Sequence, residues 1–351
     1  MFSAAPFSHK LCYNSHMRNR RQVFFNCDAR FIVPLLVVID SLLSHNDPEK
    51  PIVVHIAHER NFDAQGCRER IKALVARYPF AEARFHDFSP VFARHADELS
   101  SESQWPPMVW AFPLFTELVP DISGTVVYLD VDMLIRRDLG ELFDLDLASG
   151  GYLAAAVDEC PHETRQVLEK CGWPKDAGDY FNNGTMVVDA DAYRREGIAE
   201  KIPAIYAANR ATFFGVDQDL QNVTLGTRTL RLPVKWNYSD TWLEQIPRRN
   251  LFADRWISHR PEDVLEAVLD PCIVHFMGRF KPWNYTHRPE RGEYRAALAK
   301  LGLIGSALPG ETPLKTLEGV LFDAYHRVLK VYARRQLARL RAATSRARIM
   351  V

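Results

Sequence analysis

The feature that most constrains the fold is an apolar run that ends in two acidic residues, Val126-Val127-Tyr128-Leu129-Asp130-Val131-Asp132. Turn-forming residues precede this run, which therefore predicts a buried strand of a parallel sheet. Side chains two residues apart in extended backbone point to the same side, so both carboxylates can reach one object just beyond the strand. Open α/β sheets bind ligands at that edge. Converging carboxylates repel each other unless a positive charge lies between them, and a divalent cation is the natural candidate.

Alternating strand and helix patterns predict the fold class. In the first half we expect strands at 22–26, 52–57, 83–88 and 126–130, and helices at 31–43, 63–78 and 110–118. Such alternation with right-handed crossovers gives an α/β fold with a mostly parallel sheet. The second half predicts a mixed sheet on the same core, with strands at 152–157, 185–188, 230–234 and 272–276 and a helix at 194–209.

Composition narrows the classes of function. The formal net charge is +0, so the whole molecule has no attraction to nucleic acid. The six cysteines form no CxxC pattern and no paired framework, which fits a reducing cytoplasm. The first residues do not resemble a signal peptide, and the longest apolar run, 31–39, is too short to cross a membrane. We therefore expect a cytoplasmic protein.

A second short apolar strand is predicted within the segment 272–285. It contains His275, and Gly278 and Lys281 follow it. Alone, a histidine after an apolar run is more often a packed core residue than a ligand. The neighbouring glycine and lysine favour a functional interpretation. Together the three residues would supply an imidazole for the ion, access to backbone amides and a cation for phosphate.

Each of three other segments has both a structural and a ligand-binding interpretation. Asn182, within the run 180–184, lies either in a turn or in a site where its amide binds ligand hydroxyls. Asp217 and Gln218 open a predicted helix, where Asp217 would cap the helix and the pair could also face a sugar. Asp158 is either a surface acid or a hydroxyl acceptor.

Taken in order, these motifs resemble those of glycosyltransferase family 8, retaining enzymes of the GT-A fold that include bacterial lipopolysaccharide galactosyl- and glucosyltransferases. The matching segments are 25–28, 128–132, 155–158, 181–184, 217–219 with Asn222, and 275–283. The resemblance implies a single Rossmann-like GT-A domain over residues 22–288. It leaves residues 1–21 as an N-terminal extension and residues 289–351 as a helical, basic C-terminal region.

The resemblance also implies a substrate, a cofactor and roles for individual residues. The donor would be a UDP-hexose carrying galactose or glucose, the cofactor Mn²⁺ or Mg²⁺, and the acceptor a glycan or glycolipid such as lipopolysaccharide. The metal would be bound by Asp130, Asp132 and His275. The nucleotide-sugar site would comprise Asn26, Cys27, Asp28, Asp130, Val131, Asp132, Asn182, Gly278 and Lys281.

The implied chemistry retains the anomeric configuration. The acceptor would arrive on the face that the leaving group vacates, and the departing phosphate can accept its proton. The implied catalytic residues are Gln218, which would stabilise the developing cation from the opposite face, and Asp158 and Asp217, the carboxylates on which a double displacement would depend.

Two departures from the family pattern keep alternatives open. Pro113 stands where relatives often carry an arginine near the donor, and Arg30 follows Asp28 where a short polar or acidic residue is more usual. A catalytically weakened nucleotide-sugar-binding protein is therefore one alternative. A metal-dependent nucleotidyl- or phosphotransferase is another, because such enzymes share carboxylates at strand ends.

The C-terminal tail combines basic residues with apolar residues near helical spacing. Residues 326–351 contain eight lysines or arginines and no acid. For 317–329 we weigh a helix docked on the core. For 330–351 we expect a helix on an anionic membrane surface, with a stripe through Tyr332 and Leu340, which would place the protein peripherally on the cytoplasmic face of the inner membrane. RNA binding is less favoured, because no interleaved aromatic platform is present.

Overall fold

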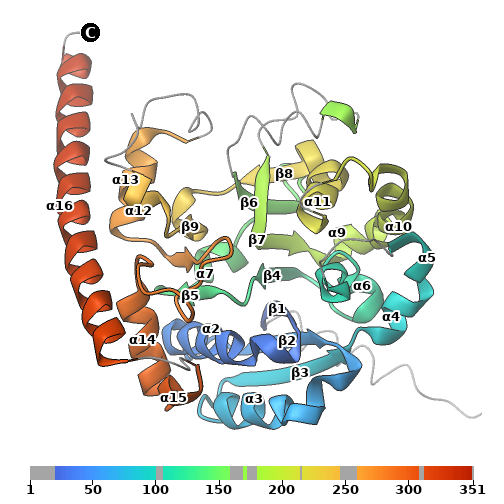
Figure 1. Ribbon diagram of the computed structural model, residues 1–351. Helices are drawn as coiled ribbons and strands as arrows, with labels where there is room; N and C mark the ends of the chain where they lie inside the picture. Colours follow the sequence, from blue (N-terminus) through green and yellow to red (C-terminus); the bar gives the residue numbers. More distant parts are fainter. Residues whose placement is uncertain are drawn as a thin grey trace, which may run out of the picture.

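A computed structural model describes residues 20–99, 106–158, 169–171, 180–213, 216–245, 259–307 and 312–349. These residues form a seven-stranded sheet with helices on both faces, a three-stranded sheet and a long C-terminal helix (Figure 1).

The large sheet has the strand order β3-β2-β1-β4-β7-β6-β8. Strand β7 runs antiparallel to its neighbours β4 and β6, and the other neighbouring strands are parallel. This arrangement confirms the predicted α/β fold with a mostly parallel sheet. The strands are β1 (Arg21–Cys27), β2 (Ile52–His58), β3 (Ala81–Asp87), β4 (Thr125–Leu129), β6 (Ala154–Asp158), β7 (Phe181–Asp189) and β8 (Thr229–Arg231).

Alternating strand residues divide between two cores, one on each face of the sheet. Val23 and Phe25 pack with α2 (Ile32–His45), α3 (Cys67–Val75) and α7 (Gly140–Phe143). Phe24 points to the opposite face. The helices there are α4 (Ser89–Arg94), α5 (Ala96–Leu99), α6 (Phe115–Leu118), α9 (Ala190–Arg195), α10 (Ile198–Asn209) and α11 (Asp217–Leu225).

Short 3₁₀ turns connect several of these elements. They are η1 (Ala29–Phe31), η2 (Arg60–Gln65), η3 (Pro107–Trp110), η4 (Gly226–Arg228) and η5 (Val234–Trp236). Two predicted helices are interrupted. The helix predicted at 110–118 is broken around Pro113, which lacks a backbone donor. The helix predicted at 194–209 divides at Gly197, whose φ of 60° is left-handed.

The small sheet brings the two predicted polar motifs together. Its order is β5 (Met133–Ile135), β10 (Ile273–His275) and β9 (Tyr238–Ser239). Strands β5 and β10 are antiparallel, and His275 pairs with Met133. Because Met133 directly follows Asp132, this register places His275 beside the Asp-x-Asp motif.

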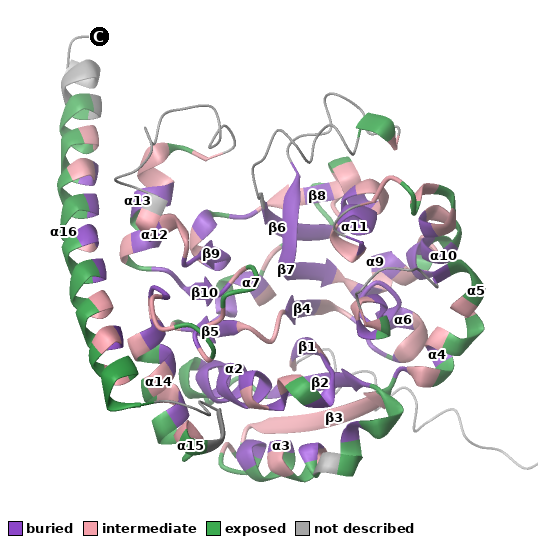
Figure 2. Cartoon of the chain, in the orientation of Figure 1, coloured by how far each residue is buried: buried purple, intermediate pink, exposed green. Residues whose placement is uncertain are grey.

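The C-terminal region ends in α16 (Pro313–Ile349), a helix of 37 residues. It packs along α12 (Trp242–Gln245), α13 (Pro261–Leu269) and α14 (Arg291–Lys300), with α15 (Ile304–Ala307) beside α14. The contact face includes Leu329, Ala333 and Leu337, which are buried (Figure 2). Within the described residues, no helix is both long and apolar enough to cross a bilayer.

The predicted exposed stripe through Tyr332 and Leu340 is wrong. Tyr332 is 41% exposed, but Leu340 lies on the helix face of Leu329, Ala333 and Leu337 and packs with them against α13 and α14. The exposed apolar residues gather earlier in α16, at Leu314, Leu317, Val320, Leu321, Tyr325, Val328, Val331 and Tyr332.

A buried ion pair joins the end of β9 to the segment before α14. Arg288 Nη2 donates to Asp240 Oδ1 at 2.6 Å and also contacts the Met277 carbonyl. The two side chains are only 7% and 0% exposed. Burial raises the pKa of Asp240, and the positive charge of Arg288 opposes this rise. The fold of this region therefore depends on the arginine.

Arg288→Met should lower the free energy of unfolding by about 3–5 kcal/mol, because it leaves the Asp240 carboxyl buried without a cation. Without that cation the carboxyl's folded-state pKa is raised further, so the loss should grow as pH rises above the ordinary aspartate range. Urea unfolding at pH 5 and pH 8 measures both effects. Arg137→Met is the control, because the Arg137–Asp270 pair is exposed (59% and 69%) and its loss should change stability little. Equal losses for the two variants would contradict this account.

Candidate functional site

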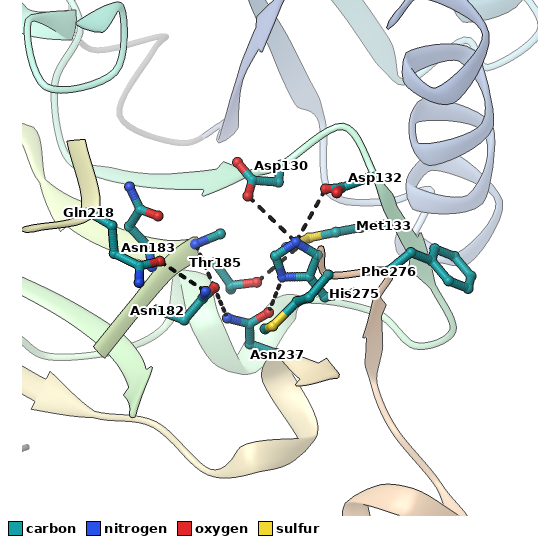
Figure 3. Close-up of polar contacts among 12 residues, drawn as sticks. Asp130, Asp132, Met133, Asn182, Asn183, Thr185, Gln218, Asn237, His275 and Phe276 are labelled. Atoms are coloured by element: carbon teal, nitrogen blue, oxygen red, sulfur yellow. Dashed lines mark hydrogen bonds and ion pairs between the residues drawn. The ribbon is translucent and has the colours of Figure 1, made fainter. Parts of the chain in front are cut away.

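Asp130, Asp132 and His275 converge at the carboxyl end of β4 (Figure 3). The two aspartates lie in the turn from β4 to β5, and His275 ends β10. His275 Nε2 is 3.2 Å from Asp132 Oδ1 and 3.6 Å from Asp130 Oδ2. One potential ligand atom from each residue lies within 4.8 Å of the other two. The structure therefore brings together the three residues that the sequence suggested as metal ligands.

A chain of amides fixes the orientation of the imidazole. The Gly184 amide donates to Asn182 Oδ1 at 2.9 Å, so this atom must be an oxygen. Asn237 Nδ2 donates to the same oxygen at 2.7 Å, which turns Asn237 Oδ1 toward His275 Nδ1 at 2.9 Å. His275 Nδ1 must then carry a proton. Nε2 faces the carboxylates, where it can donate a hydrogen bond to them or, in the neutral ring, offer its lone pair to an ion. Metal-binding histidines are oriented in this way, so the trio fits a divalent cation.

Gly184 allows β7 to approach this trio closely. A Cβ at this position would lie 2.5 Å from His275 Cε1 and 2.9 Å from Asp130 Oδ2. The turn considered for residues 182–184 is not observed, because these residues belong to β7. The pairing register of β6 and β7 shifts between Ala156 and Val157, beside this segment.

The charges of the trio are compensated from several sides. Burial and the neighbouring Asp132 raise the pKa of Asp130, whose Oδ1 accepts a hydrogen bond from the Tyr128 hydroxyl at 2.7 Å. Burial alone would also raise the pKa of Asp132, but His275 and Lys281 outweigh it and hold this pKa well below its usual value. The Lys281 ammonium contacts Asp132 Oδ2 directly.

The start of α11 forms a second wall of the site. Gln218 Oε1 accepts from Asn182 Nδ2 at 2.9 Å, and Gln218 Nε2 donates to the Tyr180 hydroxyl at 2.9 Å. Asn183 Nδ2 donates to Asp217 Oδ2 at 2.7 Å. Burial, followed by the charge of Asp130, raises the pKa of Asp217 to about 7. The prediction that Asp217 caps this helix is wrong, because Asp217 is its first residue and the N-cap position belongs to Val216.

The predicted nucleotide-binding residues lie at the carboxyl end of β1 and in the loop after β10. The Asp28 carboxylate accepts from the Arg30 amide at 2.8 Å and from its guanidinium at 2.9 Å. Burial raises the pKa of the Cys27 thiol, which makes it unreactive. Asn26 Oδ1 is buried and has no hydrogen-bond partner among the described residues.

The remaining predicted positions differ in what the structure describes. Gly278 has a φ of 77°, so it turns the loop between His275 and Lys281. Val131 lies between the two aspartates. Asp158 ends β6 opposite Phe181, and its side chain lies outside the described residues. Pro113 is buried, and its carbonyl accepts a hydrogen bond from the Tyr193 hydroxyl at 2.8 Å.

Sequence reasoning missed two residues of this site, Asn237 and Tyr180. Asn237 follows η5, more than 30 residues from the β10 motif, and no local pattern marks it. Tyr180 directly precedes the motif that includes Asn182, but its contact with Gln218 depends on how β7 and α11 pack.

Comparison with known proteins identifies the family of this chain. The family model described as "Glycosyl transferase family 8" matches residues 22–287. The chain is 32% identical over 183 residues to general stress protein A of Bacillus subtilis, an alignment that spans 51% of this chain and 60% of that protein. It is 24% identical over 268 residues to lipopolysaccharide 1,3-galactosyltransferase of Salmonella typhimurium, which spans 75% of this chain and 72% of that protein.

Some matches cover less of the relative. The alignment with lipopolysaccharide 1,2-glucosyltransferase of Escherichia coli has 26% identity over 196 residues and spans 54% of this chain and 55% of that protein. Among solved structures, the galactosyltransferase LgtC in complex with donor and acceptor sugar analogues has a TM-score of 0.60 and 21% identity, covering 85% of this chain and 99% of that one. At this identity the structural likeness concerns the fold. The match to the family model extends over most of the chain, which therefore belongs to glycosyl transferase family 8.

Proposed function

We propose that this chain is a metal-dependent retaining hexosyltransferase. It transfers galactose or glucose from a UDP-sugar to a glycan or lipid-linked acceptor such as lipopolysaccharide. The observation that carries this proposal is the trio of Asp130, Asp132 and His275, with Nε2 of the imidazole turned toward both carboxylates. The names of the lipopolysaccharide galactosyl- and glucosyltransferase relatives support the choice of sugar and acceptor.

Two carboxylates and one imidazole would hold the divalent cation. Oxygen ligands suit Mg²⁺ and Mn²⁺, and the added imidazole favours Mn²⁺. When bound, the ion supplies Lewis-acid stabilisation of the negative charge on the leaving diphosphate. On this account Lys281 and the backbone amides at Gly278 bind the same diphosphate.

The donor would lie across the carboxyl ends of β1 and β4. The buried oxygen of Asn26, together with Cys27 and Asp28, would contact the base. Val131 would contribute backbone between the two aspartates. Arg30 would have to leave the Asp28 carboxylate before it could approach the donor, because its guanidinium is paired there.

At the transferred sugar, Asn182 and Gln218 present amides in fixed orientations. Gln218 is held through both of its amide atoms, so it can stabilise a developing oxocarbenium ion but would be a poor nucleophile. Burial and the charge of Asp130 raise the pKa of Asp217 to about 7 before an ion binds, and a cation on Asp130 would remove the second of these causes. The departing phosphate would take the acceptor's proton. Asp158 is the remaining candidate for a carboxylate near the anomeric carbon.

Pro113 favours one alternative, a nucleotide-sugar-binding protein with weakened catalysis. The position where relatives often carry an arginine is occupied here by a buried ring without charge. A metal-dependent nucleotidyl- or phosphotransferase is the third candidate. The products formed from a UDP-sugar distinguish the hexosyltransferase, the weakened binder and the nucleotidyl- or phosphotransferase.

With Mn²⁺ and UDP-galactose or UDP-glucose, the protein should slowly release free hexose and UDP, because water can replace the acceptor. Asp132→Asn should lower this rate about 100-fold or more, since it removes the charge that holds the ion. Product analysis by chromatography measures the rate. Asp146→Asn is the matched control, the second aspartate of another Asp-x-Asp pattern that is exposed on the surface.

The alternatives give different products in the same assay. Binding of the UDP-sugar without hydrolysis or transfer would indicate the weakened binder. Phosphate or nucleotide transfer without release of sugar would indicate the phosphotransferase. Wild-type rates in purified Asp132→Asn at limiting Mn²⁺ would exclude the metal assignment.

We also propose that residues 22–288 form the catalytic domain, and that α16 attaches it to an anionic membrane surface on the cytoplasmic side of the inner membrane. The proposal rests on two exposed features of one helix. Leu314, Leu317 and Leu321 are 56–75% exposed near its start. Further along, Arg334, Arg335 and Arg339 are exposed. An apolar face next to basic residues is typical of helices that lie in a membrane interface.

Replacing Arg334, Arg335 and Arg339 together by glutamine should weaken sedimentation with anionic vesicles about 100-fold, at about 1 kcal/mol for each charge. High salt should weaken the wild type in the same way. Substitution leaves the packed residues Ala333 and Leu337 in place, whereas truncation would remove them. The control replaces the exposed Arg60, Arg137 and Arg260 by glutamine, with the same change in net charge. Equal binding of the two triple variants would show that α16 is not the attachment site.

A further inference from the structure

The ammonium of Lys281 is paired with one of the three residues that would bind the metal, Asp132. Lys281 Nζ contacts Asp132 Oδ2 and donates to the Phe276 carbonyl at 2.7 Å. The other oxygen of the same carboxylate, Oδ1, lies 3.2 Å from His275 Nε2. The Lys281 and Asp132 side chains are only 17% and 14% exposed. Both oxygens of one predicted ligand are therefore engaged by groups of the protein itself.

We propose that Lys281 is an internal counter-cation of the metal site. Its ammonium holds Asp132 until a diphosphate offers it another anionic partner, so that the divalent cation and the diphosphate bind cooperatively. This inference rests on the metal and diphosphate roles proposed above, and adds to them a competition between the lysine and the ion.

The backbone around Lys281 is fixed, so its side chain alone can make this exchange. The Phe276 amide donates to the Asp132 carbonyl at 3.0 Å, and the Lys281 amide donates to Asn284 Oδ1 at 2.8 Å. Arg288 holds the intervening Met277 carbonyl. The lysine stem has four rotatable methylenes, which allow the ammonium to swing while the loop stays in place.

Electrostatics makes the two cations competitors for Asp132. An ammonium and a divalent ion on one carboxylate would repel each other strongly in a site with little water. If the Lys281 ammonium left Asp132 without a new anionic partner, its charge would lose its carboxylate. A divalent ion that arrives alone must therefore break the Lys281–Asp132 ion pair. A diphosphate supplies the missing partner. Because coupling between two ligands is reciprocal, each should then strengthen the binding of the other.

Mn²⁺ binding without nucleotide tests the inference directly, using the electron paramagnetic resonance signal of free Mn²⁺ as the readout. Lys281→Met removes the charge but keeps most of the stem, and it should bind Mn²⁺ alone about 5-fold or more tightly than the wild type, a typical scale for coupled sites. Lys281→Gln should behave alike, which would show that charge rather than shape is responsible. The enhancement of Mn²⁺ affinity by UDP should be smaller in both variants than in the wild type.

Lys300→Met is the matched control. Lys300 Nζ lies 2.7 Å from a carboxylate oxygen of Asp40, whose side chain is only 4% exposed, and none of its contacts involves the trio. This variant should bind Mn²⁺ like the wild type. Circular dichroism of all variants confirms that they fold.

The outcomes separate this inference from the proposed function. Unchanged or weaker Mn²⁺ binding by folded Lys281→Met overturns the counter-cation role while leaving the metal site intact. If the wild type binds no Mn²⁺ with or without UDP, and Lys281→Met binds none either, the metal proposal fails and this inference fails with it.

Discussion

The hydrogen bond from the Gly184 amide to Asn182 Oδ1 sets the orientation of the candidate site. A backbone amide can only donate, so it fixes which end of the Asn182 amide is oxygen. The orientation of the Asn182 amide in turn fixes the Asn237 amide, which bonds to His275. On its other side, Asn182 Nδ2 donates to Gln218. The orientations of the His275 imidazole and of the Gln218 amide thus both depend on strand β7. The same strand needs glycine at 184, because a side chain there would collide with the trio.

Charge repulsion is the second constraint on the site. Asp130 and Asp132 follow one strand, and in a partly buried site they cannot both remain charged without compensation. The protein provides it through the Tyr128 hydroxyl, His275 and Lys281. The buried pair of Asp240 and Arg288 in turn holds the loop that carries Lys281. Stability and ligand binding therefore share the same short segment after β10.

Much of the architecture could be predicted because strand patterns and strand-end polarity are local signals. The apolar run before Asp130 and the one before His275 each mark a buried strand, and both polar ends meet at one edge of the structure. Asn237 could not be predicted, since its role arises from the packing of β9 beside β10. The extent of β7 was underestimated because Asn182-Asn183-Gly184 has turn composition, whereas hydrogen bonds to neighbouring side chains keep it extended. In α16, periodicity showed a helix but not which side would pack.

The most direct test of the central claim is pulsed electron paramagnetic resonance of Mn²⁺ bound to the full chain with UDP. The hydrogen bonds from Gly184 through Asn182 and Asn237 turn His275 Nε2 toward the ion. The spectrum should therefore show one directly bonded imidazole nitrogen. That signal should disappear in His275→Ala. A Mn²⁺–UDP complex of the wild-type protein with no bonded imidazole nitrogen would contradict the account.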